Sequence, residues 1–312
     1  MIYDLIIVGA GPAGMTAAIY AARRKINFLL ISLDVGGQMS WSSNVENYPG
    51  TTHASGVELV KQFQDHMAIY GIKVKQEEVS KIGKKGVLCF VKTKKNIYGG
   101  KAIIICSGKS PRKLNVPGEE EFLGKGVNYC ATCDAPLYKE KIVAVAGGGN
   151  SGLDACLFLS KYAVKIYLLE ALPKLGGEAY LRDKVLQNKK ITVITNAKIK
   201  EIIGDKFVKG LKYEKEGKES VLDVESVFIE VGLLSKTDFT DVQKNRWGEI
   251  MLFRSTQTHD ENRTSVNGVF AAGDVTDVPA KQIVVAAGEG CKAALAAFDY
   301  INRFDKTNKS KK

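Results

Sequence analysis

The hydrophobic and polar positions of this chain repeat one pattern twice. A short apolar run is followed by a glycine-rich turn, a helical pattern and a second short apolar run. Apolar runs this short, bounded by glycine and polar residues, are typical of buried parallel strands. The pattern therefore predicts two strand–turn–helix–strand units. Their strands are expected at 5–8, 28–32, 142–146 and 164–170, with helices extending through Arg24 and Tyr162.

Both glycine-rich turns match the sequence G-x-G-x-x-G, at 9–14 and at 147–152. Glycines at this spacing allow a tight turn and a close approach to a pyrophosphate, and the following helix directs its free N–H groups at the phosphates. Because each copy follows a strand and precedes a helix, both are predicted to bind a dinucleotide. The contacting residues are expected to be Gly9, Gly11, Pro12, Ala13 and Gly14 in one unit, and Gly147, Gly149, Asn150, Ser151 and Gly152 in the other.

The end of the second strand differs between the two units. At the same distance from the first glycine, one unit has Ser32 and the other has Glu170. A carboxylate at this place accepts hydrogen bonds from ribose hydroxyls and repels a 2′-phosphate, so Glu170 favours NADH over NADPH. The alternative for Glu170 is a solvated strand end. Ser32 cannot bind a ribose in this way, so the first site is expected to use other loops, at 36–38 and 46–50.

A further nucleotide-binding feature lies near the end of the chain. An apolar run ends in Gly273-Asp274 and precedes a helical pattern at 282–301. An aspartate at a strand end can bind a hydroxyl of a sugar alcohol, such as the ribityl chain of a flavin. The alternative role for Asp274 is the N-cap of the next helix.

Cys130-Ala131-Thr132-Cys133-Asp134, shortly before the second glycine-rich turn, is the clearest chemical signal. Cysteines at C-x-x-C spacing can close a disulfide across one turn, and Asp134 can protonate a departing thiolate. A zinc site would need two more ligands, and the chain has neither a second C-x-x-C nor histidines at ligand spacing, so no metal is expected. The other cysteines lie in apolar patterns and are expected in the core: Cys89, Cys106, Cys156 and Cys291.

The 312 residues are enough for two domains, each with its own core. Polar segments at 109–120 and 235–249 flank the second glycine-rich turn. The fold class is therefore expected to be α/β, with two Rossmann-like three-layer nucleotide-binding domains, the second inserted in the first. The first domain is predicted at 1–112 and 246–312 and the second at 113–245, and the two connections are expected to act as a hinge.

Composition excludes several classes of protein. Hydrophobic residues make up 45% of the chain and charged residues 25%, and no apolar stretch is long enough to span a membrane. The first apolar run has no basic residue before it and no cleavage site after it, so a cytoplasmic protein is expected, in which C-x-x-C is catalytic or metal-binding. The net charge of +11 has two interpretations: a solvated, lysine-rich surface, or a surface that attracts an acidic partner protein. No recognition helix is evident, so nucleic-acid binding is not expected.

The order and spacing of GAGPAG, GGQ, VENYPG, CATCD, GGGNSG and GVFAAGDV resemble the low-molecular-weight thioredoxin reductases, which are class II pyridine nucleotide-disulfide oxidoreductases. YCATCDAPLYK, LLEALPK and KQIVVAAGEGCKAALAAFDYI are most similar to the reductase part of the alkyl hydroperoxide reductase flavoprotein subunit. Two departures matter. NADPH-dependent thioredoxin reductases carry His-Arg-Arg-x-x-x-Arg where this chain has Glu170-Ala171-Leu172 and Gly176. The peroxide-reductase subunit has an extra N-terminal dithiol region, and this chain begins at the flavin domain.

The resemblance implies FAD in the first domain and a nicotinamide nucleotide in the second, with a homodimer as the assembly. Besides the glycine-rich turn and Ser32, the FAD-binding residues it implies are Gly37, Gln38, Asn47, Val79, Gly108, Gly273, Asp274, Lys281, Gln282 and Ile283.

The activity implied is that of a thioredoxin-disulfide reductase. Electrons would pass from NADH through FAD and the Cys130–Cys133 dithiol to a separate thioredoxin- or glutaredoxin-like protein, which would feed a peroxiredoxin. By similarity, Cys133 faces the flavin and Cys130 attacks the partner, with Asp134 as the general acid. Two alternatives stay open: the same chemistry with NADPH, ferredoxin or a deazaflavin as donor, and a flavin-binding redox sensor without turnover.

Overall fold

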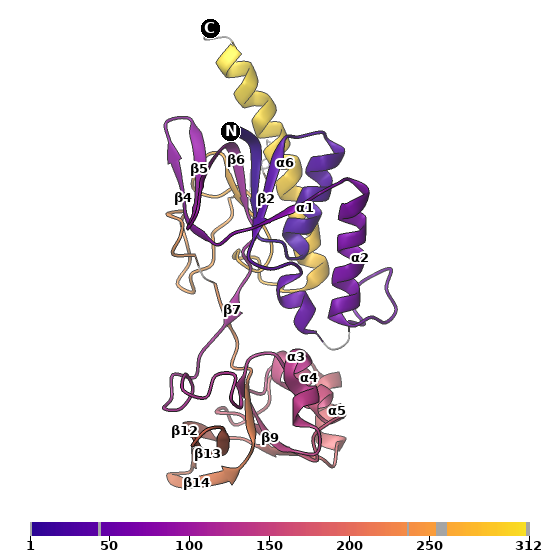
Figure 1. The fold of residues 1–312 in the computed structure, drawn as a ribbon, viewed down its shortest axis with the longest axis vertical. Coiled ribbons are helices and arrows are strands. Elements are labelled where there is room, and N and C mark those ends of the chain that lie inside the picture. Colours follow the sequence, from indigo (N-terminus) through magenta and orange to yellow (C-terminus); the bar gives the residue numbers. More distant parts are fainter. Residues whose placement is uncertain (1, 43–44, 236, 254–260, 310–312) are drawn as a thin grey trace. The chain divides into compact units, whose positions relative to one another are not determined.

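The computed structural model describes residues 2–42, 45–235, 237–253 and 261–309 (Figure 1). The chain divides into two compact units. Unit 1 contains 1–40, 44–110 and 234–312, and unit 2 contains 41–43 and 111–233. The two connections carry the short strands β7 (Ser110–Pro111) and β16 (Leu233–Leu234), which pair with each other. Unit 2 is thus inserted in unit 1.

The second junction lies earlier in the chain than the predicted boundary at 245/246. Residues 234–245 belong to unit 1. The N–H of Ile82 donates to the carbonyl of Phe239 at 2.6 Å, and Val242 is buried in the same cluster as Ile82 and Val91. The polar composition of this segment conceals these few apolar contacts.

The sheet of unit 1 has the strand order β3-β2-β1-β6-β5-β4, with β17 beside β6. The pairs β1–β2, β1–β6, β2–β3 and β6–β17 are parallel, and β4–β5–β6 are antiparallel. Val8 is level with Ile31 and with Ile105, so the first glycine-rich turn leaves the sheet at the centre of its carboxyl edge. The strands are β1 (Ile2–Val8), β2 (Phe28–Ser32), β3 (Val74–Gln76), β4 (Val79–Lys85), β5 (Leu88–Thr93), β6 (Ile97–Ile105) and β17 (Val269–Ala271).

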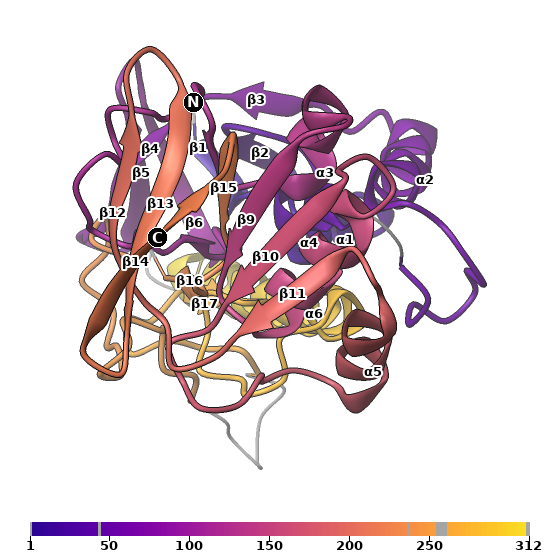
Figure 2. The ribbon, with the colours of Figure 1, turned by 90° about the horizontal axis from the view of Figure 1, so that it is seen from below.

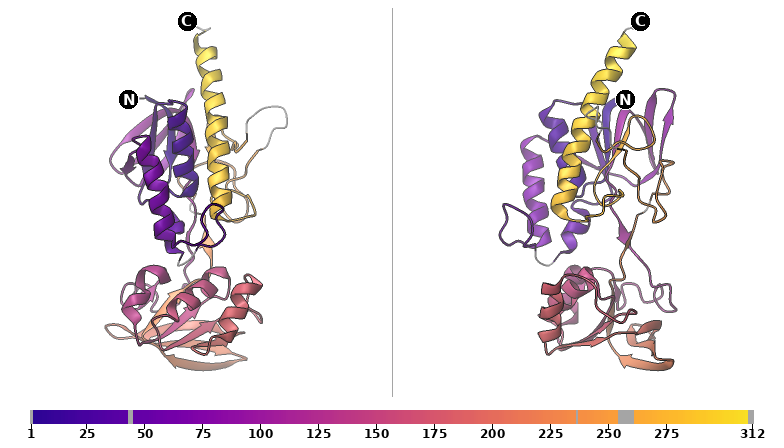
Figure 3. Two further views of the ribbon diagram at one scale, coloured as in Figure 1. Left: turned by 90° about the vertical axis from the view of Figure 1, so that its right-hand side faces the viewer. Right: turned by 180° about the vertical axis from the view of Figure 1, so that it is seen from behind.

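Three helices, α1 (Pro12–Arg23), α2 (Gly56–Ile69) and α6 (Ile283–Lys309), lie together on one face of this sheet (Figure 3). Small residues allow α1 and α6 to approach closely, since a Cβ at Gly290 would lie 2.1 Å from the carbonyl oxygen of Ala13. Ser55 and Glu58 form a capping box that starts α2. The other face packs against Val242, Ile250 and Val275 from the segments after unit 2. Unit 1 therefore has three layers.

Unit 2 is built on a parallel sheet of order β11-β10-β9-β15-β8. Figure 2 shows β11, β10, β9 and β15 side by side. Helices cover one face, and an antiparallel meander covers the other. The sheet strands are β8 (Val127–Asn128), β9 (Ile142–Ala146), β10 (Lys165–Leu169), β11 (Ile191–Ile194) and β15 (Ser226–Ile229). The helical segments are α3 (Ala131–Asp134), η2 (Ala135–Tyr138), α4 (Asn150–Leu159) and α5 (Ala179–Gln187), and the meander is β12 (Lys198–Gly204), β13 (Val208–Lys215) and β14 (Lys218–Asp223).

The α/β fold class with two nucleotide-binding units is confirmed. Strands β2 and β9 have the predicted bounds, whereas α4 ends at Leu159 and reaches Tyr162 only through a turn. The cysteines at 89, 106 and 156 are buried, and Cys291 is half-buried. Within the described ranges no helix is apolar and long enough to cross a bilayer, and no group of three potential metal ligands occurs there.

Candidate dithiol and nucleotide sites

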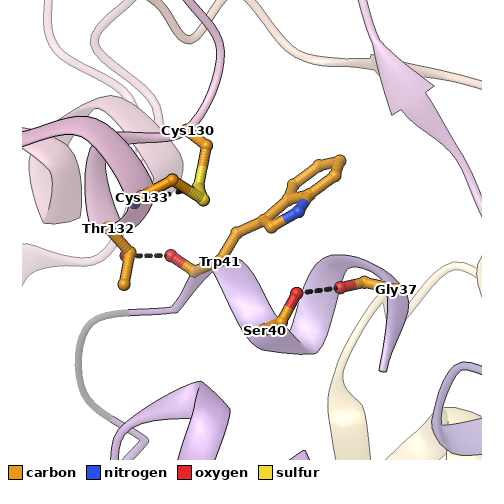
Figure 4. The surroundings of a disulfide bond; sticks show 6 residues. All are labelled: Gly37, Ser40, Trp41, Cys130, Thr132 and Cys133. Atoms are coloured by element: carbon orange, nitrogen blue, oxygen red, sulfur yellow. Dashed lines mark hydrogen bonds between the residues drawn. A yellow bond between two sulfur atoms is a disulfide. The ribbon is translucent and has the colours of Figure 1, made fainter. Parts of the chain in front are cut away.

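Cys130 and Cys133 form a disulfide, with their Cα atoms 5.4 Å apart (Figure 4). Cys130 is the N-cap of α3, and its Sγ accepts the backbone N–H of Cys133 at 3.2 Å. Thr132, on the same turn, donates its hydroxyl to the carbonyl of Trp41. A sulfur at a helix N-cap is close to backbone N–H groups, which are the groups that stabilise a thiolate.

Asp134 ends the short helix that carries the disulfide. Its side chain is half-buried, and burial raises the pKa of its carboxyl. A raised pKa keeps more of this acid protonated near neutral pH, which is what proton donation to a departing thiolate requires. The electrostatics of Asp134 therefore fit the expected acid.

The first glycine-rich turn of unit 1 has the shape of a dinucleotide cradle. Gly9 has a φ of +104°, which other residues rarely adopt, and a Cβ at Gly14 would lie 1.8 Å from the carbonyl oxygen of Gly9. Pro12 occupies the first turn of α1. A Cβ at Gly11 would have its nearest neighbour 3.9 Å away, so the helix N-terminus is open to a phosphate. The residues present thus fit a bound dinucleotide.

Ser32, expected at the FAD site, braces this turn. Its Oγ accepts the N–H of Ala10 at 3.1 Å, and the side chain is buried. The residue therefore connects the end of β2 to the glycine-rich turn.

The loops implied by the family resemblance converge on the same edge of unit 1. Gly37 approaches Gly11, with 3.7 Å between its Cβ position and the Cα of Gly11. The amide of Gln38 donates to the carbonyl of Lys109 at 3.2 Å. The same convergence includes Gly108 beside Gln38, Gly273 beside Ala13, and Asn47, whose amide donates to Gln282 at 3.1 Å.

The other implied FAD residues have different surroundings. Val79 begins β4 and packs on the sheet face opposite the helices. Ile283 is the first residue of α6 and packs on the helix face. Asp274 is separated from α6 by the loop 275–282, so the N-cap alternative does not apply.

A charged network lies beside Asp274 and was not anticipated from the sequence. Oε1 of Glu249 is 2.8 Å from Nζ of Lys109 and 3.2 Å from Nζ of Lys281. The other carboxylate oxygen accepts the amide of Asn245 at 2.7 Å. Burial alone would raise the pKa of Glu249, but hydrogen bonds from Lys109, Asn245 and Lys281 outweigh it and lower the pKa to about 2.

Asp274 is the second acid of this region. Burial raises the pKa of its carboxyl, and the positive charges of Lys281 and Lys109 oppose that shift. The network therefore places two lysines near the aspartate expected to bind a ribityl hydroxyl.

The second glycine-rich turn, in unit 2, has the same geometry as the first. Gly147 has a φ of +108°, and a Cβ at Gly152 would lie 1.8 Å from the carbonyl oxygen of Gly147. Gly149 is the N-cap of α4, and a Cβ there would meet nothing within 4 Å. Asn150 and Ser151 begin the helix, and Oδ1 of Asn150 accepts the N–H of Glu178 at 2.7 Å. This turn also fits a bound dinucleotide.

Glu170 is fixed against this turn. Its Oε2 accepts the N–H of Gly148 at 2.6 Å, and its Oε1 accepts the N–H of Leu172 at 2.9 Å. A Cβ at Gly148 would lie 2.9 Å from Oε2, so the absence of a side chain there makes room for the carboxylate. Glu170 is thus a positioned acid rather than a loose strand end.

A pocket of about 420 Å³ lies on the Glu170 side of unit 2. Leu175 joins it to the glycine-rich turn, because Cδ2 of Leu175 is 2.6 Å from the Cβ position of Gly148. The pocket is lined by Lys174, Leu175, Arg182, Leu186, Val193 and Thr195. Its residues come from three separate segments, so no local sequence motif indicates it.

Two glycine-rich turns that fit a dinucleotide, one in each unit, and a C-x-x-C disulfide in the inserted unit are the features of a pyridine nucleotide-disulfide oxidoreductase. The family described as pyridine nucleotide-disulphide oxidoreductase matches residues 3–290, and the chain belongs to this family. Membership implies FAD and a nicotinamide nucleotide as cofactors. The expected family resemblance is thereby confirmed.

The chain is similar over most of its length to proteins with two different names. It is 39% identical over 311 residues to the F subunit of alkyl hydroperoxide reductase from Escherichia coli, covering 96% of this chain and 58% of that protein. It is 38% identical over 306 residues to a protein named NADH dehydrogenase from Ferdinandcohnia aciditolerans, again covering 96% and 58%. The chain therefore spans less than two thirds of these relatives.

The structure is similar to low-molecular-weight thioredoxin reductases. The crystal structure of Lactococcus lactis thioredoxin reductase matches with a TM-score of 0.89 and 33% identity, covering 96% of this chain and 99% of that one. This likeness extends over the whole architecture, including the inserted unit.

Proposed function

We propose that this chain is a thioredoxin-disulfide reductase that takes electrons from NADH. They would leave through the Cys130–Cys133 dithiol to a small thioredoxin- or glutaredoxin-like protein, which feeds a peroxiredoxin. The observation that carries the proposal is the disulfide at the N-terminus of α3, in the same unit as a complete dinucleotide turn. We propose a cytoplasmic homodimer as the working form.

The two cofactors are assigned to different units. FAD is held in unit 1 by the turn at 9–14 and the converging loops that carry Gln38, Asn47, Asp274 and Gln282. NADH is held in unit 2 by the turn at 147–152 and by Glu170. When bound, the flavin supplies the two-electron relay between the nicotinamide and the disulfide.

NADH is favoured over NADPH by the position of Glu170. Its carboxylate accepts N–H groups at the turn, so a ribose hydroxyl can add a hydrogen bond to the same oxygens. A 2′-phosphate at that place would meet a negative charge. Lys174 and Arg182 line the adjacent pocket, and their positive charges oppose part of this repulsion.

The dithiol would act by thiol–disulfide exchange. The thiolate of Cys130 attacks one sulfur of the partner disulfide, a mixed disulfide forms, and the partner's other sulfur leaves as a thiolate. The Cys133 thiol then loses its proton and attacks Cys130, which restores the Cys130–Cys133 disulfide, and the two thiolates of the released partner take up that proton and one from solvent. The N–H of Cys133 at the Cys130 sulfur supports Cys130 as the attacking residue.

Asp134 would donate the proton for this cycle. Two electrons reduce the disulfide to one thiolate and one thiol, so one proton must be supplied to a sulfur. The half-buried carboxyl of Asp134, next to Cys133 in the chain, is placed on the same turn. We therefore assign Asp134 as the general acid.

Anaerobic mixing tests the proposal. The FAD-loaded protein is mixed with NADH or NADPH in a stopped-flow instrument, and flavin absorbance and free thiols are followed. We expect NADH to bleach the flavin rapidly and to yield two thiols that are absent in the Cys130→Ser variant. Bleaching by neither nucleotide would overturn NADH as donor, and reduction by ferredoxin or a deazaflavin would then identify the donor.

A second candidate function is direct NADH oxidation without the dithiol, since one relative is named NADH dehydrogenase. Under that function, the Cys133→Ser variant should oxidise NADH with an external electron acceptor as fast as the wild type. The dithiol would then be dispensable for the activity. Loss of disulfide reduction in Cys133→Ser, with flavin bleaching retained, supports the dithiol relay instead.

A further inference from the structure

Glu230 is a half-buried acid that the proposed electron path does not use. It follows β15 directly, and its N–H donates to the carbonyl of Ala146 at 2.8 Å. A Cβ at Gly147 would lie 2.3 Å from the carbonyl oxygen of Glu230, and a Cβ at Gly152 would lie 3.6 Å from the Cβ of Glu230. The side chain therefore starts beside the glycine-rich turn and the first turn of α4.

The strand order places Glu230 at a functional edge of the sheet. In the order β11-β10-β9-β15-β8, the chain continues from β9 to one side and returns to β15 on the other. Dinucleotides cross an α/β sheet at such a reversal, at the carboxyl ends of the strands. Glu170 directly follows β10 on the adenosine side, so Glu230, across β9, lies on the nicotinamide side.

The surroundings of Glu230 favour its neutral form. Burial raises the pKa of Glu230 to about 8, and the negative charge of Asp154 adds to this shift. On the same helix, Cys156 has a pKa raised by burial and by Glu230. The end of β9 and the turn after it place the uncharged Ala146 and Gly147 beside Glu230. The loop after β15 receives a backbone hydrogen bond at Gly232 from Arg112, at 2.9 Å.

A half-buried carboxyl group beside a pyrophosphate site needs an explanation. If it were ionised, it would repel the phosphates and carry an uncompensated desolvation cost. As a neutral acid it repels nothing and offers one O–H donor and an acceptor. Glu230 has a perturbed pKa and lies at the carboxyl edge of the sheet, where ligands bind. It is therefore a candidate for contact with the ligand.

We propose that Glu230 binds the nicotinamide half of the dinucleotide as a neutral acid, its carboxyl O–H donating a hydrogen bond to an oxygen of the nicotinamide riboside. The proposal rests on the assignment of unit 2 as the nicotinamide nucleotide site. Ionisation of Glu230 removes the donor and adds a negative charge near the pyrophosphate. Dinucleotide affinity should therefore fall as pH rises past neutrality.

The test measures NAD⁺ binding to the FAD-loaded full chain by calorimetry across a pH series. NAD⁺ cannot reduce the flavin, and it neither gains nor loses a proton in this range. We expect Kd to rise about tenfold between about pH 7 and about pH 9, because only the protonated fraction binds well. In Glu230→Gln, which keeps an N–H donor and has no charge, Kd should stay flat.

Two variants separate ligand contact from a structural role. Asp154→Asn removes the negative charge that opposes ionisation of Glu230, so the rise in Kd should begin at a lower pH. Glu170→Gln should weaken binding at every pH and leave the slope unchanged. If Glu230 had only a structural role, Glu230→Gln would not flatten the dependence of Kd on pH, and Asp154→Asn would not shift its midpoint.

The outcomes distinguish this inference from the proposed function. A flat wild-type Kd, or an unchanged slope in Glu230→Gln, overturns the role of Glu230 and leaves the proposed function standing. Failure of both NAD⁺ and NADP⁺ to bind at any pH overturns the proposed function and this inference together.

Discussion

The carboxylate of Glu170 and the backbone N–H of Gly148 are 2.6 Å apart, which joins the end of β10 to the glycine-rich turn of unit 2. The same carboxylate also accepts the N–H of Leu172. These two bonds fix its direction before any ligand binds. Such preorganisation lowers the entropy that a nucleotide must give up on binding.

Replacing Glu170 by Ala should therefore relax the choice between nucleotides. Loss of a charged hydrogen-bond acceptor should lower kcat/KM for NADH by about 10- to 100-fold. Loss of the negative charge should raise kcat/KM for NADPH. Steady-state kinetics with both nucleotides check this, with the exposed Glu216→Gln as a charge-matched control. A wild-type enzyme that prefers NADPH would contradict the assignment.

Replacing Cys130 or Cys133 by serine should block thiol–disulfide exchange at different steps. In Cys133→Ser, Cys130 can attack the partner but nothing resolves the product, so a mixed disulfide should accumulate. In Cys130→Ser, no mixed disulfide should form. Non-reducing electrophoresis and intact mass, with a thioredoxin as the partner, distinguish these results, and Cys291→Ser serves as a control outside the disulfide. Accumulation in Cys130→Ser instead would reverse the two roles.

Local rules made part of this molecule predictable from its sequence. Both glycine-rich turns and the strands β2 and β9 follow from short-range sterics, because a residue such as Gly9 has a positive φ wherever this turn forms. The disulfide is also predictable from local spacing, because Cys130 and Cys133 are three positions apart and lie on one turn. Such features depend on neighbours in the chain and need no knowledge of the tertiary fold.

Long-range contacts could not be predicted in the same way. Lys109 and Glu249 are 140 positions apart, and neither belongs to a motif that points to the other. In the sequence Glu230 is one acid at the end of an apolar run, and its partial burial and raised pKa depend on β9 and α4, which lie beside it only in the fold. The segment 234–245 reads as polar, although Val242 anchors it in unit 1.

Asp134→Asn should lower the activity of the protein without lowering its stability. Because the folded pKa of Asp134 is raised, its effect on stability is favourable at low pH and is lost as pH rises through the folded pKa. Near neutral pH the amide should therefore leave the melting temperature unchanged or higher. Dithiol turnover should fall by about 10²- to 10⁴-fold, as for loss of a general acid. Unchanged turnover would remove Asp134 from the mechanism.

Glu249→Gln should destabilise unit 1 and weaken FAD retention, because Lys109 and Lys281 lose their shared carboxylate. We expect a loss of roughly 1 to 3 kcal/mol near neutral pH. The pKa of Glu249 is lowered from 4.5 to about 2, so its stabilisation is present above the unfolded value and disappears as pH falls through the folded one. Denaturant unfolding at several pH values should show the two proteins converging in acid. The exposed pair Lys113–Glu120 provides the control, since Glu120→Gln breaks a solvent-screened ion pair and should change stability far less than Glu249→Gln. A gap between wild type and Glu249→Gln that persists at the lowest pH would mean that packing, rather than charge, accounts for the effect.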